Sequence, residues 1–189
     1  MAKKLTKEVR KKKKKWIALV APREFNNLEI GESLCSEPKE LIGKVVAVNL
    51  SSLISDPRKQ NIRIRFRVND VKEEKATTEI IGYEILPAYI KRVVRRGRGK
   101  IEDSFICESK DKVRMRIKPL ILTKNKTKKS ILSTLRKMTR EFFIKNLENV
   151  NYSEVIRALI ANKFQREIKN YLKKVYPIAI CEIKILKRE

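Results

Sequence analysis

The sequence predicts an α+β fold. We expect an antiparallel β-rich core, barrel-like or a sandwich, with C-terminal helices, a final strand and a basic N-terminal arm. Three observations predict it: apolar and polar residues alternate from about residue 16 to 122, the apolar period lengthens to 3.6 residues after Thr123, and Lys and Arg dominate the first fifteen positions. With 42% hydrophobic residues, the 189-residue chain can build a sizeable core.

The predicted organisation has three parts. Residues 1–15 form a basic flexible arm, residues 16–123 a β-rich region with one short helix, and residues 124–189 a helical region that ends in a strand and packs on the same domain. The arm is a block of like charge, which orders on a polyanion or else remains a solvated tail. It runs into Trp16, which we expect to anchor the base of the arm in the core rather than to stack on a nucleobase.

Seven stretches in the first region have the two-residue period of strands and are separated by turn residues such as Gly31, Gly43 and Pro57. The expected strands cover residues 16–21, 28–35, 44–50, 62–71, 77–85, 101–109 and 113–122.

The helical period predicts four helices. They cover residues 88–96, 128–147, about 151–160 and 164–172, and residues 178–186 form the last strand. Asn151 and Glu154 resemble a capping box at the start of the third helix, and Pro177 must follow the end of the fourth.

Several classes of chemistry are excluded. The chain contains no histidine, which excludes Ser-His-Asp and Cys-His catalysis and every imidazole metal site. Neither a phosphate-binding loop nor a dinucleotide fingerprint is present. The adjacent acids Glu73-Glu74 and Glu102-Asp103 are expected at turns or on the surface. We therefore expect no metal, no cofactor and no enzyme, with a carboxylate-only RNA-modifying site as the one enzymatic alternative.

The three cysteines, Cys35, Cys107 and Cys181, are too far apart in sequence for paired zinc ligands and lie among apolar residues. We expect them to be reduced and buried, as in an intracellular protein. The apolar run of residues 16–22 is too short for a signal peptide or a membrane span, so neither export nor membrane insertion is indicated.

The formal charge is +25, from 47 Lys and Arg against 22 Asp and Glu, and it predicts a polyanionic partner. The cations gather in the arm and on two strands, residues 62–68 and 112–118, in which cations alternate with apolar residues. Two further groups are an Arg-Gly stretch at residues 92–100 and a lysine cluster before a helix, at residues 124–129. The candidate RNA-binding residues are Lys11, Lys12, Lys13, Lys14, Lys15, Arg63, Arg65, Arg67, Arg92, Arg95, Arg96, Arg98, Lys100, Arg114, Arg116, Lys118, Lys124, Lys126, Lys128 and Lys129.

Two of these groups have a further physical argument. Lysines at residues 124–129 oppose the macrodipole of the helix that they precede, and a bound phosphate would reverse the sign of that interaction. The strand cations face an anion, or else acids such as Glu79, Glu108 and Asp103 lie across from them.

The order of several short motifs resembles a known family over nearly the whole chain. They are Lys14-Lys15-Trp16, Ala21-Pro22 with Phe25, Gly43 before a strand, Gly82-Tyr83-Glu84, Tyr89-Ile90, Val93-Val94-Arg95-Arg96, the 112–122 strand, Val175-Tyr176-Pro177 and Ile183-Lys184-Ile185-Leu186-Lys187. In this order they resemble the archaeal and eukaryotic S-one-e (S-three-Ae) family of small-subunit ribosomal proteins.

The resemblance implies a structural protein of the small-subunit platform, with a β-rich core, near the 3′ end of the small-subunit rRNA and the mRNA exit. Its partners would be that rRNA, neighbouring platform proteins and mRNA near the exit. By position, residues 11–15, 92–100 and 124–129 would contact rRNA. The chain stops after the final strand motif, so contacts made by the longer tail of many relatives are not expected.

We therefore expect a non-enzymatic constituent of the small ribosomal subunit, in the cytoplasm, that binds rRNA mainly through phosphates. The alternative is a free-standing RNA or DNA chaperone, or a nucleic-acid-packaging protein, which the same charge would suit.

Overall fold

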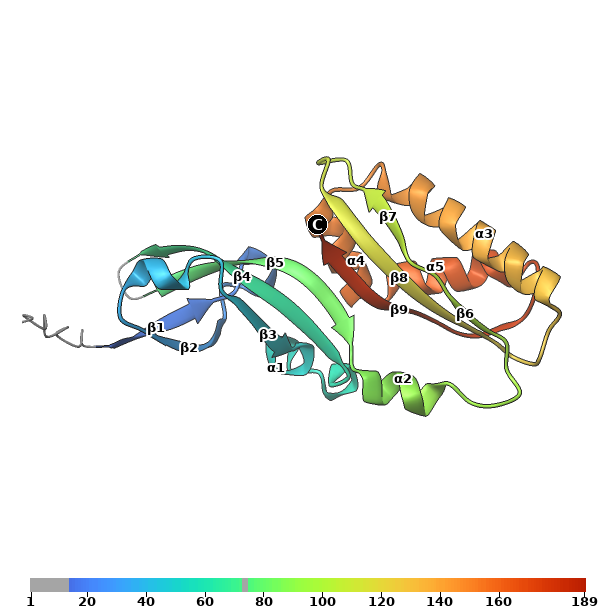
Figure 1. Ribbon diagram of the computed structural model, residues 1–189, viewed down its shortest axis with the longest axis horizontal. Coiled ribbons are helices and arrows are strands. Elements are labelled where there is room, and N and C mark those ends of the chain that lie inside the picture. The colour runs from blue at the N-terminus through green and yellow to red at the C-terminus, as the bar shows by residue number, and fades with distance from the viewer. Residues whose placement is uncertain (1–13, 73–74) are drawn as a thin grey trace, which may run out of the picture.

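The computed structural model describes residues 14–72 and 75–189 (Figure 1). The predicted arm contacts Lys11, Lys12 and Lys13, and the Glu73-Glu74 pair, lie outside the described residues. The molecule is elongated, with the early strands at one end and the C-terminal helices at the other. No helix in the part that is described is long and apolar enough to cross a membrane.

Nine strands form one mixed sheet, in which the order β2-β1-β5-β9-β8-β6 is extended by β3 and β4 beside β5 and by β7 beside β8. The strands are β1 (Lys15–Val20), β2 (Glu29–Cys35), β3 (Val45–Asn49), β4 (Ile62–Lys72), β5 (Lys75–Ile85), β6 (Lys100–Glu102), β7 (Phe105–Glu108), β8 (Arg114–Thr123) and β9 (Ile178–Arg188). Within the described chain β2 pairs only with β1 and β3 only with β4, so the sheet is open rather than a closed barrel or a two-sheet sandwich.

Strand β5 connects the two ends of the sheet. One of its edges pairs along its whole length with β4, while the other pairs first with β1 and then, at Gly82–Glu84, with β9. The β1–β5 pair is parallel, which corrects the prediction of a purely antiparallel sheet. Parallel neighbours need a long connection, and here β2, β3 and β4 together supply it.

The two-residue period predicts the long strands well. On β4, Ile64, Phe66 and Val68 are buried and the intervening arginines are exposed. The strand expected over residues 101–109 is instead two strands, β6 and β7, on the same edge of β8. Asp103 interrupts them, because its carboxylate accepts from the Ser104 amide and pairs with Arg140 on the covering helix, 3.0 Å away.

The helices are α1 (Leu50–Ile54), α2 (Pro87–Val93), α3 (Lys129–Leu147), α4 (Tyr152–Ile160) and α5 (Lys163–Leu172), with 3-10 turns η1 (Arg23–Phe25), η2 (Pro38–Leu41) and η3 (Pro57–Lys59). Helix α1, which begins after an Asn49 cap, is absent from the prediction.

Two helix termini differ from the prediction. Helix α2 ends at Val93, so Arg95 and Arg96 follow it in the loop instead of closing its last turn. Asn151 is the N-cap residue of α4, as predicted, but its side chain makes no capping bond. The Tyr152 amide donates instead to the carboxylate of Asp111, from the loop between β7 and β8.

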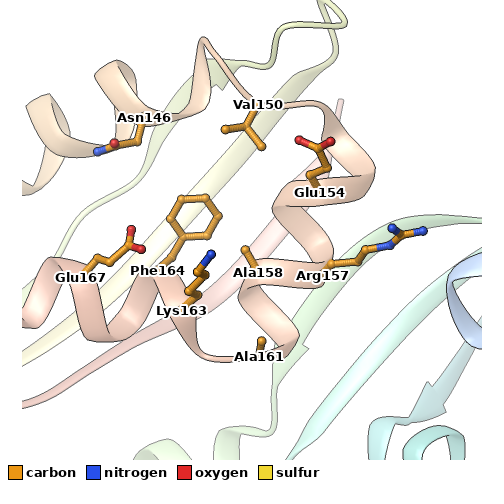
Figure 2. A pocket seen from close by; sticks show the side chains of 9 residues that line it. All are labelled: Asn146, Val150, Glu154, Arg157, Ala158, Ala161, Lys163, Phe164 and Glu167. Atoms are coloured by element: carbon orange, nitrogen blue, oxygen red, sulfur yellow. The ribbon is translucent and has the colours of Figure 1, made fainter.

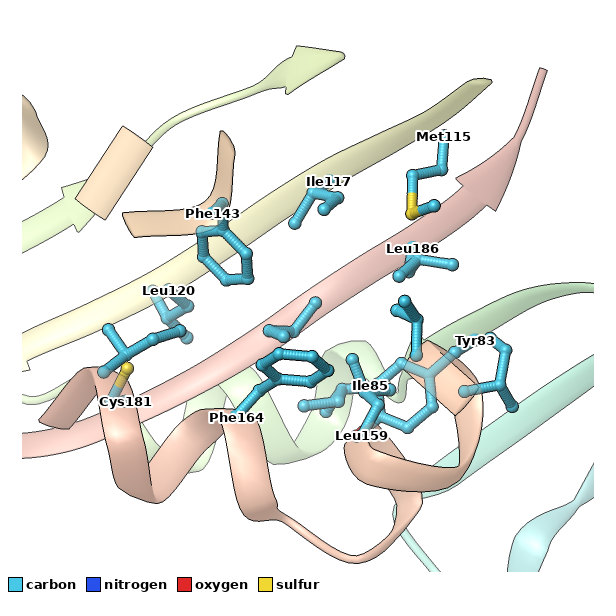
Figure 3. Close-up of a cluster of buried hydrophobic side chains, with 14 of the residues drawn as sticks. Tyr83, Ile85, Met115, Ile117, Leu120, Phe143, Leu159, Phe164, Cys181 and Leu186 are labelled. Carbon is cyan, nitrogen blue, oxygen red and sulfur yellow. The ribbon is translucent and has the colours of Figure 1, made fainter. Parts of the chain in front are cut away.

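The main core lies between the sheet and α3, α4 and α5 (Figure 3). Phe143 of α3 and Phe164 of α5 lie over β8 and β9, where Ile117 and Leu186 are almost completely buried. Burying large apolar side chains of this kind stabilises the fold by about 1.5–3 kcal/mol each. A second, smaller cluster around Ile17, Leu19, Cys35, Leu41, Val68 and Ala76 fills the far end of the sheet.

The predicted state of the cysteines is confirmed, and the predicted position of the tryptophan is wrong. All three cysteines are buried free thiols. Burial raises the pKa of Cys181 to about 12, so its thiol stays protonated at neutral pH. Trp16 is 63% exposed, because Ile17 and Leu19 occupy the inward face of β1 and Trp16 precedes them on the outward face, paired with the partly exposed Leu34.

Candidate nucleic-acid interface

Three basic segments that are distant in sequence meet at one end of the molecule. They are the loop between α2 and β6, the linker between β8 and α3, and the turn between α5 and β9, all at the end of the sheet away from β1 and β2 (Figure 1). We call this surface the basic end. Its cations are Arg92, Arg95, Arg96, Arg98, Lys100, Lys124, Lys126, Lys128, Lys129, Lys173 and Lys174.

The first two segments are held together at Gly99 and Thr123. The Gly99 amide donates to the Thr123 hydroxyl oxygen at 2.8 Å, and the Thr123 amide donates to the Gly99 carbonyl at 2.9 Å. The Thr123 hydroxyl in turn donates to the Asn125 carbonyl at 2.6 Å, which bends the chain into the lysine linker. Gly99 is buried and Thr123 is completely buried, so these bonds are shielded from water.

The third segment joins through the same linker. The Lys124 amide donates to the Pro177 carbonyl at 3.0 Å, and the Tyr176 hydroxyl donates to the Lys126 carbonyl at 3.5 Å. This places Lys173 and Lys174 beside the linker lysines. Sequence reasoning missed both, although their position just before Pro177 marked them as turn residues.

The start of α3 has the electrostatics that the sequence predicts. Lys128 is the N-cap with extended backbone, its side chain caps nothing, and the first turn contains no acidic residue. The free backbone N–H groups and the exposed lysines are therefore both positive, and no acidic side chain of the described residues neutralises them in the first turn.

The basic end differs from β4 and β8, which we call the arginine strands, because most arginines on those strands have acidic partners. On the strands, Arg114 pairs with Glu108 at 2.9 Å, Arg116 with Glu189 at 2.7 Å and Arg65 with Glu84. Arg67 lies 4.0 Å from Glu79, which also binds Arg188. Of the acids expected across from the strand cations, Glu79 and Glu108 do pair with strand arginines, whereas Asp103 binds Arg140 on α3.

At the basic end only Lys100 has an acidic partner among the described residues, Glu102 at 3.0 Å, and this pairing lowers the pKa of the Glu102 carboxyl. Arg92 lies over the ring of Tyr89, 5.5 Å from its centroid. The remaining cations are uncompensated by the described acids, so the positive potential concentrates here.

The other predicted contacts lie elsewhere. Lys14 and Lys15 are exposed at the start of β1, at the opposite end of the sheet, next to Trp16. Arg63 and Lys118 lie on the arginine strands without an ion pair inside the described ranges. Pairing across β4, β5, β9 and β8 also aligns Arg65, Lys187 and Arg116 in one row, and sequence reasoning missed Lys187.

A pocket of about 530 Å³ between the C-terminal helices has a different character (Figure 2). Phe164 lies at its centre, with Val150 and Ala158 beside it, and Glu154 and Glu167 project from α4 and α5. Across the described residues there is no cluster of three or more Cys, Asp or Glu side chains that could hold a metal ion. The pocket therefore offers an apolar depression with two separate carboxylates, and no catalytic constellation.

The clearest titration anomaly is Glu182 on β9. Burial raises the pKa of its carboxyl from 4.5 to about 7, against a smaller opposing effect of Lys169. The folded state therefore binds the proton more tightly than the unfolded state does. The resulting stability is present below about pH 4.5 and is lost as the pH rises through 7.

At pH 8 we expect the free energy of unfolding of Glu182→Gln to be about 2–3 kcal/mol higher than that of the wild type. At pH 4.5 the two free energies of unfolding should be nearly equal. Urea unfolding at both pH values measures the difference. Glu154→Gln, at an exposed position, is the matched control for net charge. A constant difference between Glu182→Gln and the wild type across this pH range would contradict the prediction.

In this mixed sheet backed by helices the uncompensated cations gather at one end, and a basic patch of this kind is typical of nucleic-acid-binding proteins. Comparison with known proteins is more specific. The chain belongs to the ribosomal S3Ae family, whose family model matches residues 2–188. This confirms the resemblance seen in the sequence and the prediction that the chain is not an enzyme.

Individual relatives are similar over most of their length. A Staphylothermus marinus protein named small ribosomal subunit protein eS1 is 32% identical over 172 residues, 91% of this chain and 81% of that protein. The proteins of the same name from Halorubrum lacusprofundi and Methanothermobacter thermautotrophicus are each 29% identical, and the matches cover 95% and 91% of this chain and 83% and 88% of those proteins.

Proposed function

We propose that the chain is a structural constituent of the small ribosomal subunit, located at the platform near the 3′ end of the small-subunit rRNA and the mRNA exit. The observation that carries the proposal is the basic end, which belongs to a member of a ribosomal protein family and in which, among the described residues, only Lys100 has an acidic partner. The names of the relatives support assembly into the small subunit.

The mechanism is phosphate binding. Lysines and arginines of the basic end contact the rRNA backbone and release its counterions, while the free N–H groups at the start of α3 bind a phosphate directly. The guanidiniums of Arg95, Arg96 and Arg98 bind phosphate in bidentate geometry. Because side chains cannot read base edges in the deep, narrow major groove of double-stranded RNA, the shape of the RNA sets most of the specificity. Lys14 and Lys15 with the exposed Trp16 form a second contact at the far end of the sheet.

Sedimentation tests the proposal. In a sucrose gradient of lysate from cells that express the chain naturally, we expect it in the small-subunit peak at one copy per subunit, by quantitative mass spectrometry. A free or polydisperse distribution that follows bulk nucleic acid would favour the chaperone alternative. For the purified chain on a structured rRNA fragment, about ten neutralised phosphates give a slope of log K against log salt between roughly −7 and −9. A slope near zero would rule out the phosphate mechanism.

A further inference from the structure

A second pocket, which adjoins the basic end at Tyr89, opens where β5 and β9 diverge. The two strands pair only between Gly82–Glu84 and Ile185–Lys187, and below this pairing a pocket of about 420 Å³ separates them. This volume is typical of a small-ligand site. Its lining comes from seven places in the chain: η3, the start of β4, the end of β5, α2, the turn between α4 and α5, α5 and β9.

The polar groups of this pocket are only partly satisfied by the protein. The carboxylate of Glu182 lines it and has no hydrogen bond or ion pair to any residue in the described part of the chain. Outside the lining, on β5, the buried Tyr83 hydroxyl has no hydrogen-bond partner among the described residues, and burial, followed by the charge of Glu182, raises the pKa of its phenol. Unpaired buried polar groups are costly, so a ligand that supplied donors to the carboxylate would recover that cost.

Cations outnumber acids in the rest of the lining, where the one further carboxylate, Asp56, accepts from the Arg58 backbone amide. Arg58 and Arg166 lie on opposite sides of the pocket, both exposed and both without an ion pair among the described acids. Lys59 ties the two sides together by donating to the Ile160 carbonyl at 2.9 Å. Tyr89 contributes an aromatic side chain from α2.

We propose that this pocket binds a guanine base of single-stranded RNA, a role that rests on the proposed function of RNA binding. Above the pKa of about 7, the ionised carboxylate of Glu182 offers two acceptors side by side. Among the four RNA bases, only guanine presents two adjacent donors, N1–H and the exocyclic amine, on its Watson–Crick edge. Glu182 accepts both, Tyr89 packs against the base, and Arg58 and Arg166 bind the phosphates on either side.

The cations favour RNA over the other chemistry that a lone carboxylate attracts. An arginine side chain from a neighbouring protein could also present two parallel N–H donors to Glu182. It would however enter among three cations, Arg58, Lys59 and Arg166, against the single further carboxylate of Asp56, and the excess of like charge opposes binding. A guanine nucleotide carries negatively charged phosphates beside the N–H donors of its base. The phosphates suit the cations of the pocket, and the donors suit the carboxylate of Glu182.

The test uses the full chain and fluorescein-labelled RNA pentamers, UUGUU and UUAUU, with fluorescence anisotropy at pH 8, where Glu182 is ionised, and at a salt concentration at which UUUUU no longer binds. We expect the guanine pentamer to bind about 10-fold or more tighter than the adenine pentamer, since a bidentate base contact gives roughly 5- to 100-fold discrimination. The inosine pentamer, which lacks the exocyclic amine, should bind with intermediate affinity. Glu182→Gln should abolish the guanine preference, while Glu167→Gln, in the helical pocket, should keep it.

Arg166→Gln is a second variant that leaves Glu182 in place. We expect it to weaken the binding of all pentamers and to preserve the ratio between guanine and adenine. Equal affinities for guanine and adenine in the wild type would overturn the proposal. So would a guanine preference that survives Glu182→Gln, or an arginine-rich peptide that binds through Glu182 in place of RNA. Steep salt dependence on a structured rRNA fragment, with no guanine preference, would refute this pocket and leave the proposed function standing.

Discussion

Replacing Arg95, Arg96, Lys126 and Lys128 together by glutamine should weaken binding to a structured rRNA fragment by on the order of 10²- to 10³-fold at 0.1 M salt. Each of these cations is exposed and lacks an acidic partner among the described residues, so each is free to neutralise a phosphate. The slope of log K against log salt should become shallower by about 3–4, one phosphate for each charge removed. Anisotropy titrations at several salt concentrations measure both quantities.

The matched control removes the same number of charges from the arginine strands. In the quadruple glutamine variant at Arg65, Arg67, Arg114 and Arg116, each lost guanidinium has an acid within ion-pair distance. We expect this variant to lose less than about 10-fold in affinity, because those charges are already partly neutralised. Equal losses in the two variants would show that total charge, and not the basic end, governs binding.

Gly99→Asn should destabilise the protein by about 2–4 kcal/mol and weaken RNA binding without any change of charge. A Cβ at Gly99 would lie 2.8 Å from the Thr123 hydroxyl oxygen and 3.0 Å from the Leu132 side chain. It would force apart the buried bonds that hold the Arg-Gly loop to the lysine linker, at the cost of overpacking and of unpaired polar groups. Chemical denaturation and the same RNA titration measure the two effects.

Gly97→Asn provides the comparison. Gly97 has φ +82°, which asparagine tolerates better than other side chains, and a Cβ there would meet nothing within 4 Å. We expect it to cost less than about 1 kcal/mol and to leave RNA affinity within about 2-fold. If both variants bound RNA equally well, the Gly99 junction would have no part in shaping the basic end.

The sequence predicts those parts of the fold that depend on local periodicity. The alternation of Ile64, Phe66 and Val68 with arginines predicts both the strand β4 and its buried face. The strong apolar stripe through Leu135 and Phe143 likewise predicts α3, with its start off by a single residue.

Features that depend on distant contacts are not predictable from the pattern. The parallel pairing of β1 with β5 depends on how three intervening strands fold back. The break between β6 and β7 depends on Asp103 reaching Arg140, 37 residues later. Trp16 lies in β1 itself, and its outward position follows because tertiary packing buries the opposite face of that strand, with Ile17 and Leu19.

The candidate site shows the same division. Charge clusters are local, so residues 92–100 and 124–129 are recognisable in the sequence. Their convergence depends on the antiparallel register of β6 with β8, which aligns Lys100 with Leu122 and brings Gly99 to Thr123. The pairing of the strand arginines with Glu84 and Glu189 is equally invisible, because these acids are 19 and 73 residues away from their partners.

The position of β9 constrains when this protein can fold. The last strand of the chain lies between β5 and β8, and Gly82 pairs with Lys187 across more than half of the sequence. Closing such a long loop is entropically costly and slow, and it cannot begin until β9 has been synthesised. Until then β5 and β8 keep unpaired edges, and the apolar face below α3 to α5 lacks its central strand. Folding of this half of the molecule is therefore a late event in synthesis, and a chain interrupted before residue 178 would leave those edges open to aggregation.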